Sequence, residues 1–224
     1  MSTLVLVRHG QASFGGPAYD ELSDLGLRQG ELLRSYWLGR GETFDEVWSG
    51  SLARQRDSAR LALVQPQVDP RWNEYDADAI LARLGPGLAE RRPEFRALWA
   101  AHLAAPRDPR TFQRMFEPLM LAWVTGEAAD ADVEPWAAFR DRVRAVLADV
   151  MAAPHSRRVA VFASGGPIGV AVMTVLGAPD WRALELNWRL RNGSLTTFLF
   201  SPGRVSLDGF NATPHLALAE ETFR

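Results

Sequence analysis

Four residues near the start of the chain are of types that suit chemistry on an anion. Arg8, His9, Gly10 and Gln11 directly follow an apolar run at 4–7. Arginine supplies a permanent cation, and histidine supplies a base or nucleophile that works near neutral pH. Glycine lets the backbone approach a ligand closely. These residue types favour chemistry on an anion, and a phosphate group fits them best.

Polar residues also stand at three later points where an apolar strand pattern ends. They are the segment 49–54, which closes with Arg54, then Glu74, and then Ser164 with Gly165. In an open α/β sheet the carboxyl ends of parallel strands share one edge, where ligands bind. Helix N-termini at that edge present N–H groups and a positive dipole end, both of which suit phosphate. Arg54 would lie in the first turn of its helix, where a bound anion would offset its repulsion from the dipole.

The elements that must position these residues follow from hydrophobic periodicity and turn signals. Strands alternate with helices, which predicts an α/β fold: a three-layer αβα sandwich with a mostly parallel sheet. We expect a single domain over 1–224 with a helical cap insertion at about 76–154, where the pattern becomes rich in Ala, Leu and Arg. The expected strands are 3–7, 44–48, 67–72, 158–163, 195–200 and 204–207. The expected helices outside the cap are one from Ser23 or Asp24, one over 52–64, and one that ends at Leu176 with Gly177 as its C-cap.

Composition narrows the classes of function. The 224 residues carry a net charge of −2, which gives no reason to expect binding to nucleic acid or to an anionic membrane. The chain has no Cys and its 25 basic residues are all Arg, so an anion clamp here must use guanidinium groups. The absence of Cys also suits a cytoplasmic protein. Four scattered His residues show no metal-ligand spacing, and no metal site is expected.

Several motifs together make the chain resemble the histidine phosphatase superfamily, which includes the phosphoglycerate mutases. They lie in the family's order and span nearly the whole chain. The matching segments are 6–11, 22–26 with 29–30, 49–54, 164–168 and 192–194. The resemblance implies the phosphoglycerate mutase-like fold and hydrolysis of a phosphorylated small molecule without a metal or cofactor.

The resemblance also implies a role for each catalytic residue. His9 would attack phosphorus and become a phosphohistidine, and Arg8 and Arg54 would hold the phosphoryl oxygens. Glu74 would protonate the leaving oxygen and then activate water. Gln11, Ser164 and Gly165 would bind the phosphate group. For Glu74 the alternative is a surface carboxylate in an Asp-rich loop, and for Ser164 it is a simple N-cap serine.

The sequence departs from the family pattern at three positions. Ser164 stands where the family usually has a second His, Ala12 replaces a frequent Ser or Thr, and Gly15 stands where mutases carry Asn. A serine donates only a neutral hydrogen bond, worth about 1 kcal/mol against roughly 1.5–3 kcal/mol for a charged donor. The alternatives are therefore a catalytically weak or inactive phosphate-binding relative and, less favoured, a phosphoglycerate mutase. His102, His155 and His215 are candidates to replace the missing His, and His215 is the one whose segment can fold back along the sheet.

Ser164 also raises the hypothesis of a serine hydrolase. A nucleophile elbow needs the pattern Gly-x-Ser-x-Gly, and Phe162 stands where its first Gly should be. The sequence therefore argues against this alternative. Oligomeric state and the identity of the substrate do not follow from the sequence.

Overall fold

A computed structural model describes residues 1–13, 20–152 and 156–223. Within it the chain divides into two compact units, residues 1–74 with 142–224 and residues 75–141. Strands and helices alternate through the first unit, as an α/β fold requires. Its strands are β1 (Ser2–Arg8), β2 (Glu46–Ser49), β3 (Gln67–Val68), β4 (Arg158–Ala163), β5 (Leu195–Ser201) and β6 (Arg204–Ala212). Its helices are α1 (Asp24–Gly39), α2 (Ala53–Ala62), η1 (Pro70–Trp72), α7 (Gly165–Leu176), α8 (Arg182–Arg189) and η2 (Leu218–Glu220).

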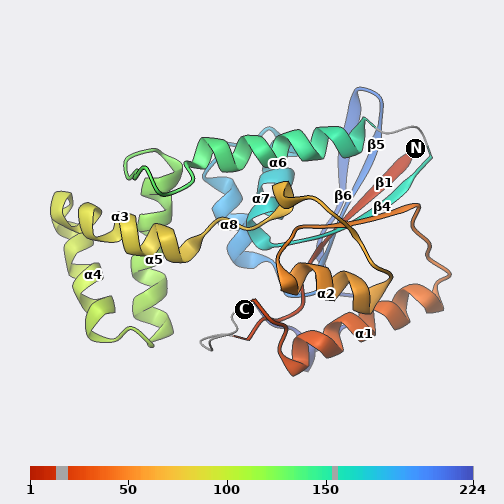
Figure 1. The fold of residues 1–224 in the computed structure, drawn as a ribbon, viewed down its shortest axis with the longest axis horizontal. Coiled ribbons are helices and arrows are strands. Elements are labelled where there is room, and N and C mark those ends of the chain that lie inside the picture. Colours follow the sequence, from red (N-terminus) through yellow and green to blue (C-terminus); the bar gives the residue numbers. More distant parts are fainter. Residues whose placement is uncertain (14–19, 153–155, 224) are drawn as a thin grey trace. The chain divides into compact units, whose positions relative to one another are not determined.

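The six strands form one sheet in the order β3-β2-β4-β1-β5-β6. Strands β4, β1, β5 and β6 of this sheet are labelled in Figure 1. The pairs β3·β2, β2·β4 and β4·β1 are parallel, whereas β5 and β6 add an antiparallel edge. In the β1·β4 register Arg8 lies opposite Ala163. His9 directly follows the end of β1, and Ser164 directly follows the end of β4. The two residues therefore leave the sheet at the same edge from adjacent strands. This arrangement confirms the predicted mixed α/β fold with a mostly parallel sheet.

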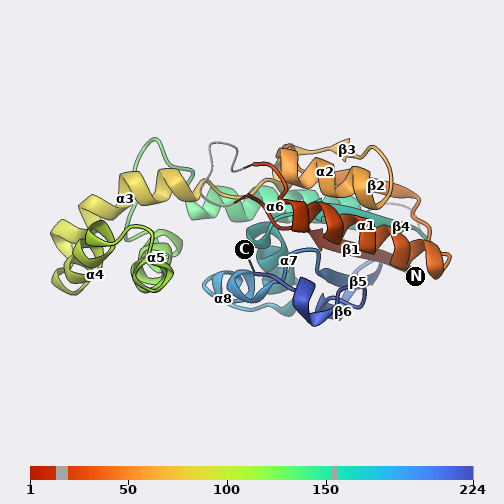
Figure 2. The same cartoon turned by 90° about the horizontal axis from the view of Figure 1, so that it is seen from below.

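One face of the sheet carries a hydrophobic core that explains why two helices cover it. Val5 and Val7 of β1 point to this face, because alternate residues of a strand face the same side. They pack in a buried cluster with Leu33 and Trp37 of α1 and with Ala59 of α2. Helix α7, with α8 beside it, lies on the opposite side of the sheet (Figure 2). The site edge therefore lies between helix layers that are fixed by apolar packing.

Local signals in the sequence set the ends of several elements. Ser23 is the N-cap of α1, and its hydroxyl accepts from the N–H of Gly26. Gly177 ends α7 with a φ of 61°, a left-handed conformation that glycine adopts without steric cost. The β5–β6 hairpin turns at Gly203, whose φ is 70°. The ends at Ser23 and Gly177 agree with the predictions made from the sequence, and the turn at Gly203 falls between the strands predicted over 195–200 and 204–207.

Four expectations for the first unit need correction. The last strand, expected over 204–207, continues to Ala212 as it pairs along β5. The strand predicted over 67–72 ends at Val68, because Pro70 begins the 3-10 helix η1 and Asp69 caps it. The second strand covers 46–49 instead of 44–48. The predicted strand and helix pattern left out α8, a short helix of eight residues. Its brevity leaves little room for a periodic signal in the sequence.

The second unit is helical and has its own buried core. It contains α3 (Ala77–Arg91), α4 (Pro93–Ala104), α5 (Pro109–Val124) and the start of α6 (Trp136–Met151), which continues into the first unit. Tyr75, Trp123 and Phe139 pack their rings together, with ring centroids 5.2–5.9 Å apart. Across the described part of the chain, no helix is long and apolar enough to cross a membrane.

Candidate active site

His9 is buried at the carboxyl end of β1, and both its backbone N–H and its carbonyl form hydrogen bonds. Its N–H donates to the carbonyl of Ala163 at 3.0 Å. Its carbonyl accepts from the N–H of Gly193 at 3.2 Å and from the side chain of Asn192 at 3.3 Å. These bonds tie the end of β1 to the end of β4 and to the turn that precedes β5. The imidazole is thus mounted on a rigid part of the sheet.

Hydrogen bonds determine which nitrogen of His9 carries the proton. Nδ1 lies 2.7 Å from the carbonyl oxygen of Gly10, which can only accept, so Nδ1 donates. Nε2 accepts from the Nε–H of Arg54 at 3.2 Å, so Nε2 holds a lone pair. Burial, the charge of Arg54 and the charge of Arg8 hold the pKa of His9 well below its usual value of 6.5, although the bond to Gly10 acts the other way. His9 is therefore a neutral imidazole at physiological pH, with an unprotonated Nε2 beside a guanidinium group.

Arg54 lies in the first turn of α2 and is 8% exposed. Its Nη1 forms an ion pair of 2.7 Å with Oδ1 of Asp20, and Oδ2 of the same carboxylate accepts from the N–H of Ala53 at 2.7 Å. Asp20 therefore places a negative charge at the N-terminus of α2, which offsets the unfavourable position of a cation there. The carboxylate binds the guanidinium and the helix N–H in the way that a phosphate oxygen pair would.

Arg8 brings a second guanidinium charge close enough to His9 to lower the imidazole pKa. Its Nη1 donates to the carbonyl of Phe223 at 3.0 Å and to the carbonyl of Leu190. The N–H of Asn192 donates to the carbonyl of Thr222 at 2.8 Å, which holds the same C-terminal segment beside the site. Arg8 is thus positioned by segments that lie more than 180 residues away in the sequence.

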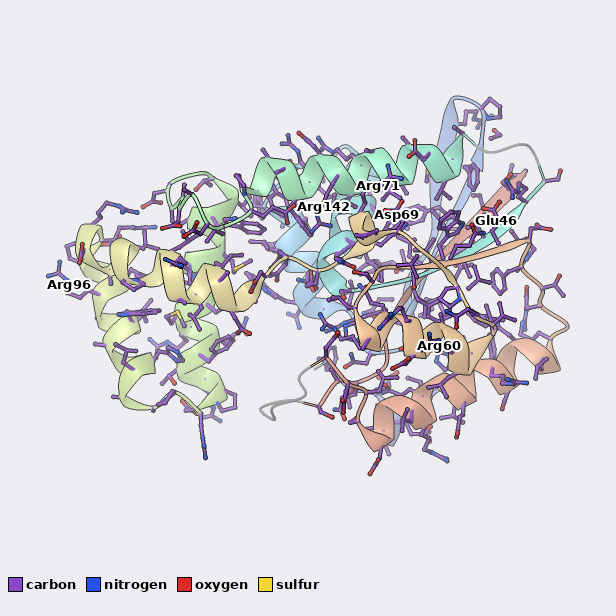
Figure 3. The ribbon with its side chains drawn as sticks, viewed as in Figure 1. Glu46, Arg60, Asp69, Arg71, Arg96 and Arg142 are labelled. Carbon is purple, nitrogen blue, oxygen red and sulfur yellow. The ribbon has the colours of Figure 1, made fainter. Side chains whose placement is uncertain are left out.

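Glu74 stands at the N-terminus of α7. Both of its carboxylate oxygens lie 3.1 Å from the N–H of Gly166, so the half-buried carboxylate occupies the positive end of the helix dipole. The loop before Glu74 is held by Arg142, which donates to the carbonyls of Arg71 and Asn73 at 2.8 and 2.9 Å. Figure 3 labels Arg142 and Arg71 at this loop. Glu74 is therefore in a defined position at the site edge.

Further ion pairs hold the same loop. Arg71 pairs with Asp69 at 2.6 Å and with Asp149 of α6 at 2.7 Å. Asp69 and Arg71 are labelled side by side in Figure 3. The loop is thus bound to α6 through two arginines, Arg71 and Arg142.

Ser164 is the N-cap residue of α7, but its side chain does not cap the helix. It is fully buried, and its Oγ accepts from Nε2 of Gln55 at 2.9 Å. The next residue, Gly165, is packed so closely that a Cβ there would lie 1.8 Å from Oδ1 of Asn187. The simple N-cap interpretation of Ser164 is therefore wrong for its side chain, because the hydroxyl faces Gln55 instead of the first turn.

The segment after His9 packs tightly against the start of α1. A Cβ on Gly10 would lie 2.5 Å from the carbonyl oxygen of Gly26, which leaves no room for a side chain. The N–H of Gln11 donates to Gln29 at 2.8 Å, and its side-chain oxygen accepts from Ser23 at 2.9 Å. Gln11 is thus placed at the N-terminal end of α1.

The structure brings together residues from four strand ends. His9 and Arg54 are in direct contact, Glu74 lies at the N-terminus of α7, and Ser164 is bonded to the residue after Arg54. Among the other histidines, His215 is half-buried near Gly193, and His102 packs between Trp99 and Phe112 in the helical unit. His155 and Gly15 lie outside the described residues. Within the described ranges, no group of three or more His, Asp or Glu residues is arranged to hold a metal ion.

Sequence reasoning did not single out two residues that the structure places in the site. Asp20 reaches Arg54 from 34 positions away, and Gln55 reaches Ser164 across 109 positions. Neither has a local motif of its own that marks it. The one feature of the sequence that could have pointed to Gln55 is its position directly after Arg54, at the end of a polar strand-to-helix turn.

The fold and the site define a mixed α/β protein whose polar residues gather at the carboxyl ends of parallel strands, around a neutral histidine and two arginines. The chain belongs to the histidine phosphatase superfamily (branch 1), whose sequence profile matches residues 4–213. A comparison with curated protein sequences finds no match.

Solved structures show the same fold. A phosphoserine phosphatase mutant from Entamoeba histolytica, crystallised with phosphoserine, superposes with a TM-score of 0.68 at 18% identity, covering 97% of this chain and 100% of that chain. A putative alpha-ribazole-5'-P phosphatase from Escherichia coli K-12 gives a TM-score of 0.65 at 18% identity, again over 97% of this chain and 100% of that chain. At these identities the likeness supports the fold alone.

Proposed function

We propose that this protein is a phosphomonoester hydrolase that works through a phosphohistidine at His9. The observation that carries the proposal is the state of the imidazole. Its Nδ1–H is held by Gly10 and its unprotonated Nε2 faces the guanidinium of Arg54. A buried neutral imidazole beside two cations is an activated nucleophile that selects a negatively charged reaction partner.

Family membership supports the same class of reaction. The superfamily is named for histidine-dependent phosphatases, and two of the solved proteins with this fold are described as a phosphoserine phosphatase and a putative alpha-ribazole-5'-P phosphatase. Both names refer to phosphate esters of small molecules. A phosphorylated small molecule is therefore the proposed substrate, and the chemistry described below requires no cofactor.

In the first step the lone pair of His9 Nε2 attacks phosphorus, and the bond from phosphorus to the ester oxygen breaks. The Nε–H of Arg54, which donates to Nε2 in the free protein, donates instead to an equatorial phosphoryl oxygen once the phosphate group has entered, and the guanidinium keeps its proton. Arg8 contributes the second positive charge. Glu74, in its carboxylic acid form, gives its proton to the leaving oxygen, so the alcohol departs neutral.

In the second step water replaces His9 on phosphorus. The Glu74 carboxylate removes a proton from water, the water oxygen attacks phosphorus, and the bond from phosphorus to Nε2 breaks. Inorganic phosphate leaves, and His9 and Glu74 return to their starting protonation states. The position of Glu74 on the N–H of Gly166 keeps the carboxyl group at the site edge in both steps.

A second candidate function follows from the interpretation of Ser164. We infer that Ser164 stands where relatives use a second histidine, so the phosphoryl group loses a charged donor. The chain would then bind phosphate through Arg8, His9 and Arg54 with slow or no turnover. A phosphoglycerate mutase is the third candidate, but Gly15, the position that bears on it, is outside the described residues. Neutral donors still stabilise developing charge, so we favour the hydrolase.

We also propose that the chain works as one histidine phosphatase domain in which the helical insertion, about 76–154, selects the alcohol part of the substrate. The catalytic residues proposed here all come from the first unit. Exchange of the insertion for that of a related phosphatase would test this division. The preferred ester should change while hydrolysis of p-nitrophenyl phosphate persists.

The experiment that tests the proposed function is steady-state hydrolysis of p-nitrophenyl phosphate and a panel of natural phosphomonoesters between pH 5 and pH 8. Wild type is compared with His9→Ala, and rapid quench in base with labelled substrate looks for an acid-labile phosphohistidine. We expect turnover that His9→Ala abolishes. Wild-type turnover no greater than that of His9→Ala, together with phosphate binding by calorimetry, would instead support the binding protein.

A further inference from the structure

Gln55 is a fully buried polar residue that none of the proposed chemical steps uses. It follows Arg54 in the first turn of α2 and has no exposed surface. Its Nε2 lies 2.9 Å from Oγ of Ser164 and 3.1 Å from the carbonyl oxygen of Trp72. The side chain therefore joins three parts of the site edge: the start of α2, the loop that leads to Glu74, and the start of α7.

The partner at Trp72 determines how the amide is oriented. A backbone carbonyl can only accept, so the nitrogen of the Gln55 side chain must face it. Both hydrogens of that nitrogen are then used, one on Trp72 and one on Ser164. Ser164 must accept from Gln55, and its own hydroxyl hydrogen cannot point back to the amide.

The hydroxyl hydrogen of Ser164 consequently needs an acceptor of another kind. Ser164 is fully buried, and the part of the chain that the structure describes supplies no acceptor for this hydrogen. The register places Ser164 at the level of His9 on the adjacent strand, since Arg8 pairs with Ala163. A phosphoryl oxygen bound at His9 would satisfy a donor in this position.

We propose that Gln55 is a positioning residue that turns the Ser164 hydroxyl into a donor for the phosphoryl group. The inference rests on the proposed phosphate chemistry at His9 and extends it to a residue that does not touch substrate. By accepting from Gln55, Ser164 keeps one defined direction for its hydrogen. The result is a neutral two-residue relay, from Gln55 to Ser164 to phosphate, that does not titrate between pH 5 and pH 8.

The relay is tested with a double-mutant cycle of Gln55→Met and Ser164→Ala. Methionine has nearly the length of glutamine and no donor. It loses the bonds donated to Trp72 and Ser164 but also removes Oε1, a buried acceptor with no partner among the described residues, which offsets part of that cost. Gln65→Met is the matched control, because Gln65 is an exposed glutamine in the segment that follows α2.

Two readouts are measured for each variant: kcat with p-nitrophenyl phosphate and the Kd for inorganic phosphate. Loss of one neutral hydrogen bond, about 1 kcal/mol, predicts roughly fivefold lower kcat for Ser164→Ala and for Gln55→Met. If Gln55 acts through Ser164, the second change should cost less than about twofold once the first is made. KM should change less than kcat. Because neither Gln55 nor Ser164 titrates between pH 5 and pH 8, the pH dependence of kcat should have the same shape in the variants as in wild type.

The outcomes separate this inference from the proposed function. Independent effects, in which the two losses multiply to about 25-fold, would overturn the relay while leaving the hydrolase intact. Absence of turnover in wild type would end the hydrolase proposal. The double-mutant cycle would then be evaluated from the Kd for inorganic phosphate, in which the same coupling between Gln55→Met and Ser164→Ala is expected. Absence of both turnover and phosphate binding would overturn both proposals.

Discussion

Removal of the His215 imidazole should make the protein less sensitive to acid. His215 is half-buried, with both ring nitrogens shielded from solvent, and its Nε2 lies 3.4 Å from the point where a Cβ on Gly193 would sit. In the described part of the chain neither ring nitrogen has a hydrogen-bond partner. Burial lowers the pKa of His215 to about 4, although the carboxylate of Glu220 acts in the opposite direction. The folded protein therefore holds this imidazole in its neutral form.

The sign of the effect follows from the two pKa values. In the unfolded chain His215 titrates near 6.5, whereas in the folded protein it titrates near 4. Between these values the unfolded state binds a proton that the folded state does not, so falling pH favours unfolding. The contribution is close to zero at pH 7 and grows as pH falls toward 4. Between pH 7 and pH 5 the lost free energy of unfolding is about 2 kcal/mol.

The assay is urea unfolding, followed by the fluorescence of the eight Trp residues, at pH 7 and pH 5. Wild type is compared with His215→Gln and His215→Phe, two side chains of different size that cannot take a proton. His9 has a lowered pKa too, but it contributes equally to all three proteins, so the difference isolates His215. Both variants should lose about 2 kcal/mol less than wild type between the two pH values. An equal loss in all three proteins would refute the argument from burial.

Three further predictions concern the site. Arg54→Lys should lower kcat about 100-fold, because an ammonium group cannot donate in two fixed directions at once, whereas the exposed Arg60→Lys should match wild type in the same assay. Asp20→Asn should lower KM and kcat together, because loss of the ion pair leaves the Arg54 guanidinium available to substrate but less firmly positioned. A raised KM in steady-state kinetics would contradict this. Gly165→Ala should reduce the free energy of unfolding, measured in urea, by roughly 1–3 kcal/mol, because its Cβ would overlap Asn187; unchanged stability would contradict the tight packing.

The fold and the framework of the site were predictable because their signals are local. Strand β4, helix α7 and the β5–β6 hairpin each carry their periodicity and their turn residues within one segment. The positions of Arg8, His9 and Ser164 at strand ends follow from the same patterns, since parallel strands place their carboxyl ends at one edge. The sequence therefore determined the fold class and the edge at which chemistry is expected.

The tertiary structure decided how the side chains at that edge are paired. The protonated nitrogen of His9, the ion pair between Asp20 and Arg54 and the bond from Gln55 to Ser164 all depend on distances between segments that are far apart in the chain. The same holds for the burial of His215, which sets its pKa. Periodicity reports which face of an element is apolar, but not which polar group meets which across the fold. Hydrogen-bond geometry and desolvation exist only once the chain has brought those groups together.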